Sequence, residues 1–364
     1  MLITIPHMGN VYLAAKALFD GIDVPYVIPE PNNKDSLRKG SLYSPEEMCL
    51  PFKLMMGNYM QSIEKGADTI LITGSCGPCR YGEYCELQIK TLSRLGHDLD
   101  FIVLDAPGEI GIDEFLRRIG KIFKASNKSR AEKLLSIKRA FNVIDLIDKL
   151  ESKAHFLAGY EINKGDCKRI LHQCKKDAFS CDNPAQMLKV IKEYLKKINI
   201  IPIDKTKNPI KLSIIGEIYT VIEPYSNLNI EDKLMDYGVS TKRLLTPSWW
   251  YRDMVLKPLK LNSMGLRRAS KEYLPLYIGG HGRECIGEAV LSHKEGMDGA
   301  IQIFPLGCMP EIVSKAILPS IQRDKDFPIM SLIVDEMTGE AGYMTRIEAF
   351  LDMLNHKKKH KISV

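Results

Sequence analysis

Residues 68–105, DTILITGSCGPCRYGEYCELQIKTLSRLGHDLDFIVLD, decide the fold class of this chain. The run DTILITG is rich in β-branched residues and ends in glycine, which is typical of a buried strand. Residues 84–96 then place apolar side chains at helical spacing, and residues 100–105 form a second apolar run. A strand, a helix and another strand in this order predict a parallel sheet with helices on its faces.

The same alternation of short strands and helices fills residues 1–115 and returns in residues 206–364. Between them, residues 116–205 place apolar residues at helical spacing among Lys and Glu, and no strand candidate intervenes. We therefore expect an α/β fold with two Rossmann-like lobes, each built on a parallel sheet, and a helical linker lobe inserted between them. The two lobes share this plan without an obvious repeat in their sequences.

The size and charge of the chain bear on its organisation and partners. Its 364 residues exceed a single small core, which predicts two or three lobes. The net charge is +6, but the basic residues are spread along helical stretches of residues 117–205 and in the tail 356–364. This pattern is typical of solvated helix faces, so we expect no nucleic-acid partner.

The N-terminus lacks the features of a signal peptide, and no window has the apolar length of a membrane span. We therefore expect a cytoplasmic protein that makes no membrane contact. In the cytoplasm, glutathione and thioredoxin keep thiols reduced. The nine cysteines thus indicate metal binding or redox chemistry rather than a disulfide framework.

Cysteines recur where predicted strands end. Cys76 and Cys79 follow the strand that opens the quoted stretch, Cys308 follows a later strand, and Cys49 begins a predicted helix after a Ser-Pro-Glu-Glu capping pattern. In an open parallel sheet, ligands bind beyond the carboxyl ends of the strands, and a thiolate near a helix N-terminus is ready to bind metal. These four cysteines are therefore the predicted thiolate ligands, spanning a cleft between the lobes.

Polar side chains follow other predicted strands of the second lobe. Glu223 and Tyr225 follow the strand predicted for residues 211–222, His281 lies in the sequence GGHG, and Glu336 follows the last strand. We expect these side chains to line the cleft and to donate or accept protons coupled to reduction. His281 can equally orient a ligand or cap the next helix. The sequence GGHG lacks the spacing of a dinucleotide-binding loop.

The remaining cysteines divide into two groups. Cys167, Cys174 and Cys181 are spaced by seven residues, which places them on one helix stripe, and we interpret them as small buried hydrophobic residues. For Cys85 and Cys285 two interpretations stay open. Each is either a thiol beside the ligands or an additional ligand.

The segment at residues 332–354, LIVDEMTGEAGYMTRIEAFLDML, resembles the C-terminal signature of the 2-hydroxyacyl-CoA dehydratase and benzoyl-CoA reductase (component D) superfamily. More closely, the chain is similar to the stand-alone acyl-CoA dehydratase activase-related proteins of that superfamily. The stretches that carry this similarity are PHMGN, SPEEMCLPFK, GADTILITGSCGPCRYG, GEIYTVIEPYSNLNIEDKL, GGHGRECIGEA and FPLGCMPEIVSKAILP. The similarity covers nearly the whole chain and is weakest in residues 116–205.

The resemblance implies an oxygen-sensitive, anaerobic electron-transfer protein with an iron–sulfur cluster at the interface of its α/β lobes. It implies Cys49, Cys76, Cys79 and Cys308 as the ligands, most simply of a [4Fe–4S] cluster. The implied partner is a separate ATP-hydrolysing activator, itself an iron–sulfur protein, that supplies low-potential electrons. Members of the superfamily dehydrate 2-hydroxyacyl-CoA, reduce aromatic acyl-CoA or reduce small molecules with a double-cubane cluster. A homodimer and a small-molecule or acyl-CoA substrate are therefore expected.

The chain departs from the dehydratase subunits of this superfamily in its cysteines. Those subunits use three cysteines and leave one iron open for substrate, whereas four thiolates would close the cluster and make it an electron carrier. Counting Cys85 and Cys285 gives six thiols, the number that holds two cubanes bridged by a sulfide. The sequence contains no Walker loop and no phosphate loop of the sugar-kinase type, so we do not expect this chain to be the ATPase.

Two hypotheses follow for the function. In the first, the chain is an iron–sulfur oxidoreductase component that passes electrons from the activator to a partner or to a small substrate, and whether it is itself an enzyme stays open. In the second, the same four thiolates bind structural zinc, and the chain is a non-catalytic scaffold for a protein partner. A thiol-exchange enzyme that uses only Cys76 and Cys79 is the weakest alternative, because it leaves Cys49 and Cys308 unexplained.

Overall fold

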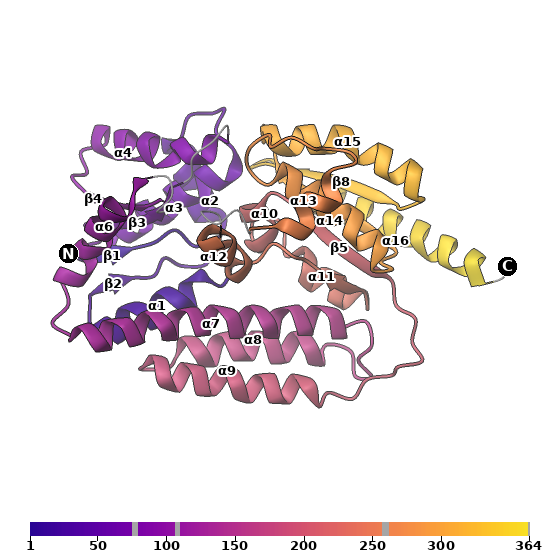
Figure 1. Ribbon diagram of the computed structural model, residues 1–364, viewed down its shortest axis with the longest axis horizontal. Coiled ribbons are helices and arrows are strands. Elements are labelled where there is room, and N and C mark those ends of the chain that lie inside the picture. Colours follow the sequence, from indigo (N-terminus) through magenta and orange to yellow (C-terminus); the bar gives the residue numbers. More distant parts are fainter. Residues whose placement is uncertain (75–78, 106–109, 257–261, 363–364) are drawn as a thin grey trace. The chain divides into compact units, whose positions relative to one another are not determined.

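The computed structural model describes residues 1–74, 79–105, 110–256 and 262–362 (Figure 1). The chain divides into two compact units, each made of three segments. Unit 1 comprises Met1–Asp148, Gln173–Glu193 and Pro247–Asn262, and unit 2 comprises Lys149–His172, Tyr194–Thr246 and Ser263–Val364. Each unit contains a four-stranded sheet in which all paired strands are parallel. The predicted α/β fold with two Rossmann-like lobes is therefore confirmed.

The sheet of unit 1 has the strand order β2-β1-β3-β4. Its strands are β1 (Ile3–Thr4), β2 (Tyr26–Val27), β3 (Thr69–Thr73) and β4 (Asp100–Leu104). The accompanying helices are α1 (Val11–Ile22), α2 (Lys34–Tyr43), α3 (Leu50–Glu64), the 3-10 turn η1 (Arg80–Glu83), α4 (Tyr84–Arg94) and α6 (Ile112–Lys124). The stretch at residues 68–105 thus forms β3, α4 and β4, as its periodicity predicts.

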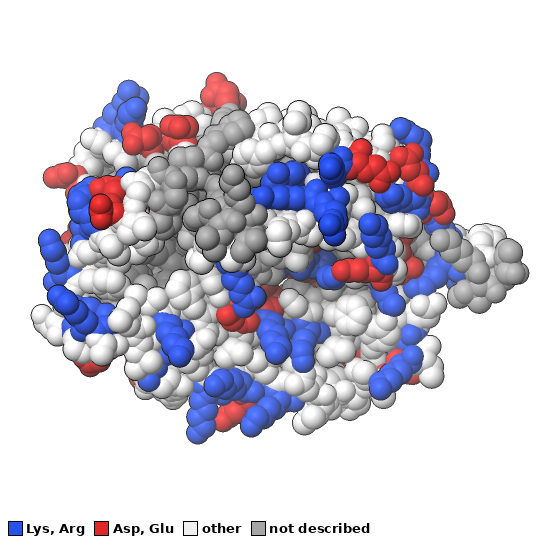
Figure 2. Space-filling view, viewed as in Figure 1, with Lys and Arg blue, Asp and Glu red and all other residues white. Residues whose placement is uncertain are grey.

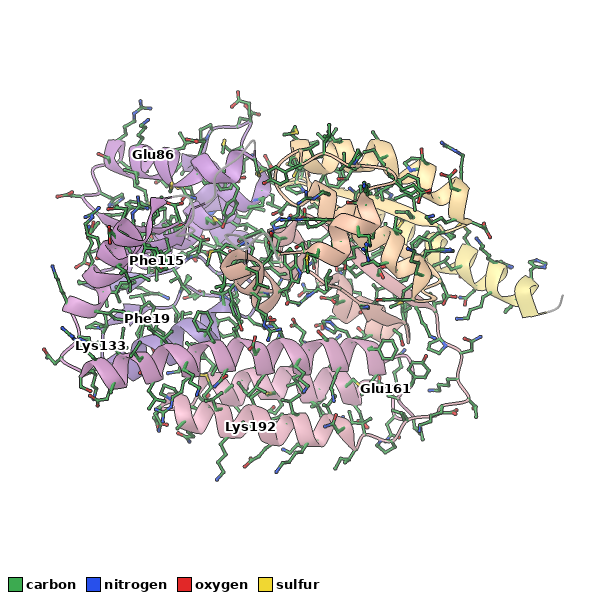
Figure 3. All side chains as sticks on the ribbon, in the orientation of Figure 1. Phe19, Glu86, Phe115, Lys133, Glu161 and Lys192 are labelled. Atoms are coloured by element: carbon green, nitrogen blue, oxygen red, sulfur yellow. The ribbon has the colours of Figure 1, made fainter. Side chains whose placement is uncertain are left out.

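Apolar residues at helical spacing attach α1 to the sheet of unit 1. Phe19, labelled in Figure 3, is fully buried on α1 and stacks on Tyr26 of β2 with ring centroids 5.4 Å apart. Ile3 of β1 and Ile122 of α6 belong to the same core cluster. Burying each such side chain stabilises the folded state by roughly 1.5–3 kcal/mol, and this packing holds α1 and α6 against the sheet.

Two glycines allow α2 and α3 to touch along their backbones. A Cβ atom at Gly40 would lie 1.6 Å from the carbonyl oxygen of Lys53, and one at Gly57 would lie 1.9 Å from that of Ser36. Every residue of α3 from Leu50 to Ser62 is buried. The helix that begins after Cys49 is therefore fixed within unit 1 from several sides.

Unit 2 has the strand order β6-β5-β7-β8. Its strands are β5 (Lys211–Gly216), β6 (Ser240–Lys242), β7 (Gly299–Pro305) and β8 (Ile329–Val334). The helices around this sheet are α10 (Ile218–Ile222), α11 (Ile230–Asp236), α13 (Met264–Ser270), α14 (Gly282–Lys294), α15 (Met309–Lys325) and α16 (Glu340–Ile362). All seven residues of β7 are buried, as expected for an inner strand of a parallel sheet.

The two sheets have the same topology, although their sequences show no obvious repeat. In each, the first strand along the chain pairs with the second on one side and with the third on the other. In parallel sheets with this strand order, α/β proteins bind ligands beyond the carboxyl ends of the first and third strands. In unit 1 those strands are β1 and β3, and in unit 2 they are β5 and β7.

The segment predicted as a helical lobe, residues 116–205, contains three further helices, α7 (Arg130–Leu157), α8 (Asp166–Phe179) and α9 (Pro184–Asn199), each divided between the units. A capping box begins α7, since Ser129 N donates to the Glu132 carboxylate (2.8 Å) and Glu132 N donates to Ser129 Oγ (3.3 Å). Between α7 and α8, the carboxylate of Glu161, labelled in Figure 3, accepts the Cys167 N–H at 2.8 Å and so stabilises the start of α8.

Helix α12 (Pro247–Leu256) belongs to unit 1, although its residues fall within the range that the sequence assigns to the second lobe. Ser248 N donates to Asp148 Oδ2 at 2.8 Å, and Tyr251 Oη donates to Asp145 Oδ1 at 2.7 Å. Both acceptors lie on α7. The periodicity of the sequence does not reveal this exchange, because it depends on pairs of residues about one hundred positions apart.

Within unit 2, a buried ion-pair network joins α7 to the sheet. The Arg243 guanidinium pairs with the carboxylates of Glu151 on α7 and Glu231 on α11, and all three side chains are less than one-tenth exposed. His155 Nδ1 lies 2.8 Å from Glu231 Oε1. Because each carboxylate is desolvated, the network depends on the arginine remaining in place.

On the surface, positively and negatively charged side chains are mixed. Figure 2 shows lysine and arginine interspersed with aspartate and glutamate over the described part of the visible face. Among the described residues, no helix combines the length and the apolar character that crossing a membrane requires.

Candidate metal centre

Each of the predicted ligand cysteines that the structure describes occupies a helix N-cap. Cys49 is the N-cap residue of α3, Cys79 is that of the 3-10 turn η1, and Cys308 is that of α15. The fourth predicted ligand, Cys76, lies outside the described residues. The unsatisfied N–H groups and the dipole of a helix N-terminus favour the thiolate, which is the form that binds metal.

The same local sequence places two of these cysteines. Cys49 and Cys308 are each followed, two positions later, by a proline in the first helical turn, Pro51 and Pro310. Proline is accepted there because the first turn makes no use of its missing N–H, and its fixed φ angle favours a helix start at that point. The pattern Cys-x-Pro therefore sets both cysteines at the boundary between loop and helix.

In unit 1, the structure brings Cys49 to the helix that follows the Cys-x-x-Cys pair. Cys49 Sγ and Tyr84 Oη are joined by a hydrogen bond, and Tyr84 is the first residue of α4. Directly before α4, η1 begins at Cys79. Both Cys49 and Cys79 are half-buried. A cysteine 30 residues upstream of Cys79 thus contacts the first residue of the helix that follows it.

The two additional thiols have different surroundings. Cys85 is buried in α4, and desolvation raises its pKa. Cys285 is fully buried in a core cluster with Ile286 and Leu318, and its pKa is raised well above the ordinary value by the same cause. Both therefore favour the neutral thiol, whereas a ligand must be a thiolate. None of the eight described cysteines is in a disulfide.

In unit 2, the first turns of α14 and α15 touch. A Cβ atom at Gly282 would lie 2.9 Å from the carbonyl oxygen of Pro310, and Ser314 Oγ donates to the Gly282 carbonyl at 3.0 Å. His281 is the N-cap of α14, next to this contact, and Cys308 is the N-cap of α15. His281 and Cys308 are therefore the N-cap residues of two helices whose first turns are in contact.

One sequence expectation about β5 is wrong. The strand predicted for residues 211–222 ends at Gly216, and residues 218–222 form α10 instead. Gly216 has a φ of 131° and packs so closely on β7 that a Cβ atom would lie 2.0 Å from the carbonyl oxygen of Ile303. Only glycine fits there, and the chain leaves the sheet at that residue.

The residue that directly follows β5 is consequently Glu217, which sequence analysis missed. Its carboxylate caps α10 and accepts the N–H groups of Tyr219 (2.9 Å) and Thr220 (2.8 Å). Glu223 lies one helix further on and is buried, and Tyr225 is half-buried, with its pKa raised by desolvation. The signal for Glu217 in the sequence is the single glycine that precedes it.

Beyond the last strand, β8, Glu336 is half-buried in a turn. The hydroxyl of Thr338 accepts the Asp335 N–H at 2.8 Å and closes this turn. Glu336 therefore lies at the carboxyl edge of the sheet, as predicted.

A buried polar group that the sequence does not reveal lies in the first turn of α15. Glu311 is 1% exposed, its Oε2 accepts from Gln302 Nε2 at 2.8 Å, and Ser331 Oγ donates to Gln302 Oε1 at 2.7 Å. Desolvation raises the pKa of Glu311 to about 7, and the nearby carboxylates of Glu217 and Glu284 add to this effect. Three residues after Cys308, the protein thus holds a carboxyl group that takes up a proton near neutral pH.

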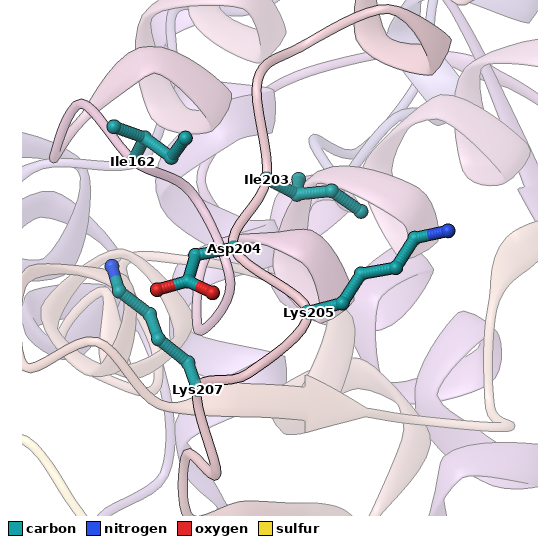
Figure 4. A pocket seen from close by; sticks show the side chains of 5 residues that line it. All are labelled: Ile162, Ile203, Asp204, Lys205 and Lys207. Carbon is teal, nitrogen blue, oxygen red and sulfur yellow. The ribbon is translucent and has the colours of Figure 1, made fainter.

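Figure 4 shows a groove of about 470 Å³ in unit 2. It is lined by Ile162, Ile203, Asp204, Lys205 and Lys207. The Lys207 ammonium is directed at the Glu161 carbonyl oxygen, 2.6 Å away. None of the candidate ligands or acids lines this groove, so the cysteines remain the candidate site.

The donor set fits a metal with a preference for sulfur. Soft thiolates select zinc and iron–sulfur clusters, and Cys49, Cys79 and Cys308 are all placed where the thiolate is favoured. Among the residues that the structure describes, no three His, Cys, Asp or Glu side chains are grouped in a way that could hold a metal ion. The chemistry of the cysteines is therefore what makes them candidate ligands.

The chain was also compared with known proteins. No protein-family model matches it, and no curated protein matches it.

Proposed function

We propose that this chain is an iron–sulfur protein that binds a [4Fe–4S] cluster through the thiolates of Cys49, Cys76, Cys79 and Cys308. It takes low-potential electrons from a separate ATP-dependent activator and passes them to a partner protein or to a small substrate. The observation that carries the proposal is the hydrogen bond between Cys49 and Tyr84. It brings a cysteine from a distant part of the sequence to the helix that follows the Cys-x-x-Cys pair.

The local structure of the ligands supports this role. Two sulfurs of a Cys-x-x-Cys turn reach a single cluster, and a third thiol at the N-cap of α3 approaches from the neighbouring helix. Cys308, the fourth proposed ligand, is the N-cap residue of α15. The proposed set has four ligands; Cys85 lies within α4, and Cys285 is fully buried in a core cluster of unit 2.

A bound cluster supplies a site that accepts and releases one electron at a time. The protein supplies thiolates that hold it and polar groups that manage protons. The phenol of Tyr225 is protonated at neutral pH, and desolvation raises its pKa further, so its proposed role is to donate a hydrogen bond rather than to act as a base. Glu223, His281 and Glu336 are the proposed groups that accept or relay protons at the same edge of the sheet.

A zinc-thiolate scaffold is the competing function, and the N-cap positions of the cysteines favour it equally. Structural zinc binds four thiolates in a closed tetrahedral site and takes part in no electron transfer. The two functions differ in the metal, in acid-labile sulfide and in colour.

The deciding experiment measures iron, zinc, acid-labile sulfide and the absorption spectrum on one sample purified without oxygen. The proposal predicts a brown protein with about four irons and about four sulfides per chain. About one zinc and no sulfide would replace it with the scaffold. About eight irons would bring Cys85 and Cys285 into the ligand set.

Variants identify the ligands. Cys49→Ser and Cys308→Ser should each lose iron, because each removes one of the four proposed thiolate ligands. Cys174→Ala is the matched control, since it removes a fully buried thiol on α8 that is not among the proposed ligands. Full iron content in Cys308→Ser would remove unit 2 from the site.

A further inference from the structure

The sulfur of Cys49 is not used to cap its own helix. Cys49 is the N-cap of α3, but its side chain makes no capping hydrogen bond to that helix within the described structure. The sulfur instead hydrogen-bonds the hydroxyl of Tyr84. A side chain on α4 is therefore directed at a proposed ligand atom that another helix carries.

Packing fixes the position of this hydroxyl. Tyr84 is 2% exposed, and its ring stands edge-on to Phe52, with centroids 5.1 Å apart and planes at 83°. The ring of Tyr81, which lies in the 3-10 turn η1 before α4, also packs on the Tyr84 ring, with centroids 5.0 Å apart. Because two aromatic rings hold the phenol, its direction does not depend on the hydrogen bond alone, and removing the oxygen leaves the ring in place.

We infer that Tyr84 is a positioning residue that donates a hydrogen bond to the Cys49 thiolate and thereby raises the reduction potential of the cluster. The inference rests on the proposed function. A thiolate carries no proton, so between these two groups the phenol must be the donor. A hydrogen bond to a ligand sulfur draws electron density from it and stabilises the more negative, reduced state of the cluster.

The structure supplies a matched control on α3. Tyr59 is fully buried, and its hydroxyl has no hydrogen-bond partner among the described residues. Tyr59→Phe deletes the same oxygen from a buried tyrosine of the same unit, and no hydrogen bond to a proposed ligand cysteine is lost with it. A change in potential that arises from lost polarity in the interior of unit 1 would appear in both variants.

The experiment measures the midpoint potential of the cluster in the full-length wild type, in Tyr84→Phe and in Tyr59→Phe, by a titration followed with electron paramagnetic resonance. Iron, sulfide and circular dichroism are recorded on each sample. We expect a lower potential in Tyr84→Phe and the wild-type value in Tyr59→Phe. Loss of iron from a folded Tyr84→Phe protein, with Tyr59→Phe fully loaded, also supports the inference, because the hydroxyl then holds the ligand sulfur in place.

Incorporation of 3-fluorotyrosine at position 84 gives a second test that retains the ring and the oxygen. The fluorinated phenol is a stronger hydrogen-bond donor, so the potential should rise, opposite to the effect of phenylalanine. An intact cluster with the same potential in all variants would overturn the role of Tyr84 and leave the proposed function standing. A wild-type protein without iron and sulfide would overturn the proposed function, and the inference with it.

Discussion

Replacing Glu311 by glutamine tests whether the protein keeps a buried carboxyl group protonated beside the N-terminus of α15. Desolvation raises the pKa of Glu311 from its ordinary value of 4.5 to about 7. Above pH 4.5 the unfolded chain releases this proton, whereas the folded protein holds it until about pH 7. Because the unfolded state binds fewer protons in that range, the free energy of unfolding falls as the pH rises.

The pKa difference sets the size of the effect. Each pKa unit is worth about 1.4 kcal/mol, so ionised Glu311 costs the folded protein about 3 kcal/mol. Roughly 2 kcal/mol of this loss falls between pH 5.5 and pH 8.5. Glutamine has the shape of the protonated acid, and its amide oxygen still accepts from Gln302 Nε2. As the pH rises over this range, the free energy of unfolding of Glu311→Gln should therefore fall by about 2 kcal/mol less than that of the wild type.

The assay is urea-induced unfolding of metal-free wild type and Glu311→Gln at both pH values. Glu288, whose pKa burial raises to about 8, contributes to the pH dependence of both proteins, and most of its contribution cancels because the Glu311 charge is the smallest cause of its shift. Glu132→Gln is the control, because Ser129 lowers the pKa of Glu132 and glutamine retains the capping box. That carboxylate is ionised in both states over this pH range, so its variant keeps the wild-type slope. If the free energy of unfolding changed equally with pH in Glu311→Gln and in the wild type, Glu311 would not be protonated in the folded protein.

Two further predictions concern the packing of each unit. Gly57→Ala should destabilise the protein by about 2 kcal/mol or more in chemical unfolding, because its Cβ would lie 1.9 Å from the Ser36 carbonyl. Gly120→Ala on α6 meets nothing within 4 Å and should stabilise by up to about 1 kcal/mol, so a similar loss in both variants would contradict the helix contact. Arg243→Met should lower the free energy of unfolding by about 3–5 kcal/mol, since it leaves two buried carboxylates without their cation. Arg38→Met, which breaks an exposed pair, should change it by less than about 1 kcal/mol, and equal effects would show that the Arg243 network is not desolvated.

The strand and helix content of the chain could be predicted because hydrophobic periodicity is local. Residues 68–105 contain their own strand, helix and strand pattern, and the structure forms these elements at those positions. The fold class follows from the order of such units. The end of β5 was mispredicted because the apolar run continues into α10, and only the close approach of Gly216 to β7 stops the strand.

The sequence could also indicate the candidate cysteines, since Cys49 and Cys308 precede helices with proline in the first turn, and Cys79 belongs to a Cys-x-x-Cys pair after a predicted strand. It could not indicate their surroundings. Glu311 is an ordinary helix residue by periodicity, and its burial against Gln302 depends on the packing of α15 against β7. Tyr84 is likewise one of several aromatic residues near the Cys-x-x-Cys pair.

By itself, the sequence thus determined the α/β class, the two parallel sheets and the cysteines at helix starts, because each depends on residues that are neighbours along the chain. The tertiary structure alone decided that Tyr84 meets Cys49, that Cys285 is a buried thiol, and that α12 joins unit 1. Those outcomes depend on contacts between residues 35 to more than 100 positions apart. Such contacts are set by the packing of whole elements, which no local pattern of side chains encodes.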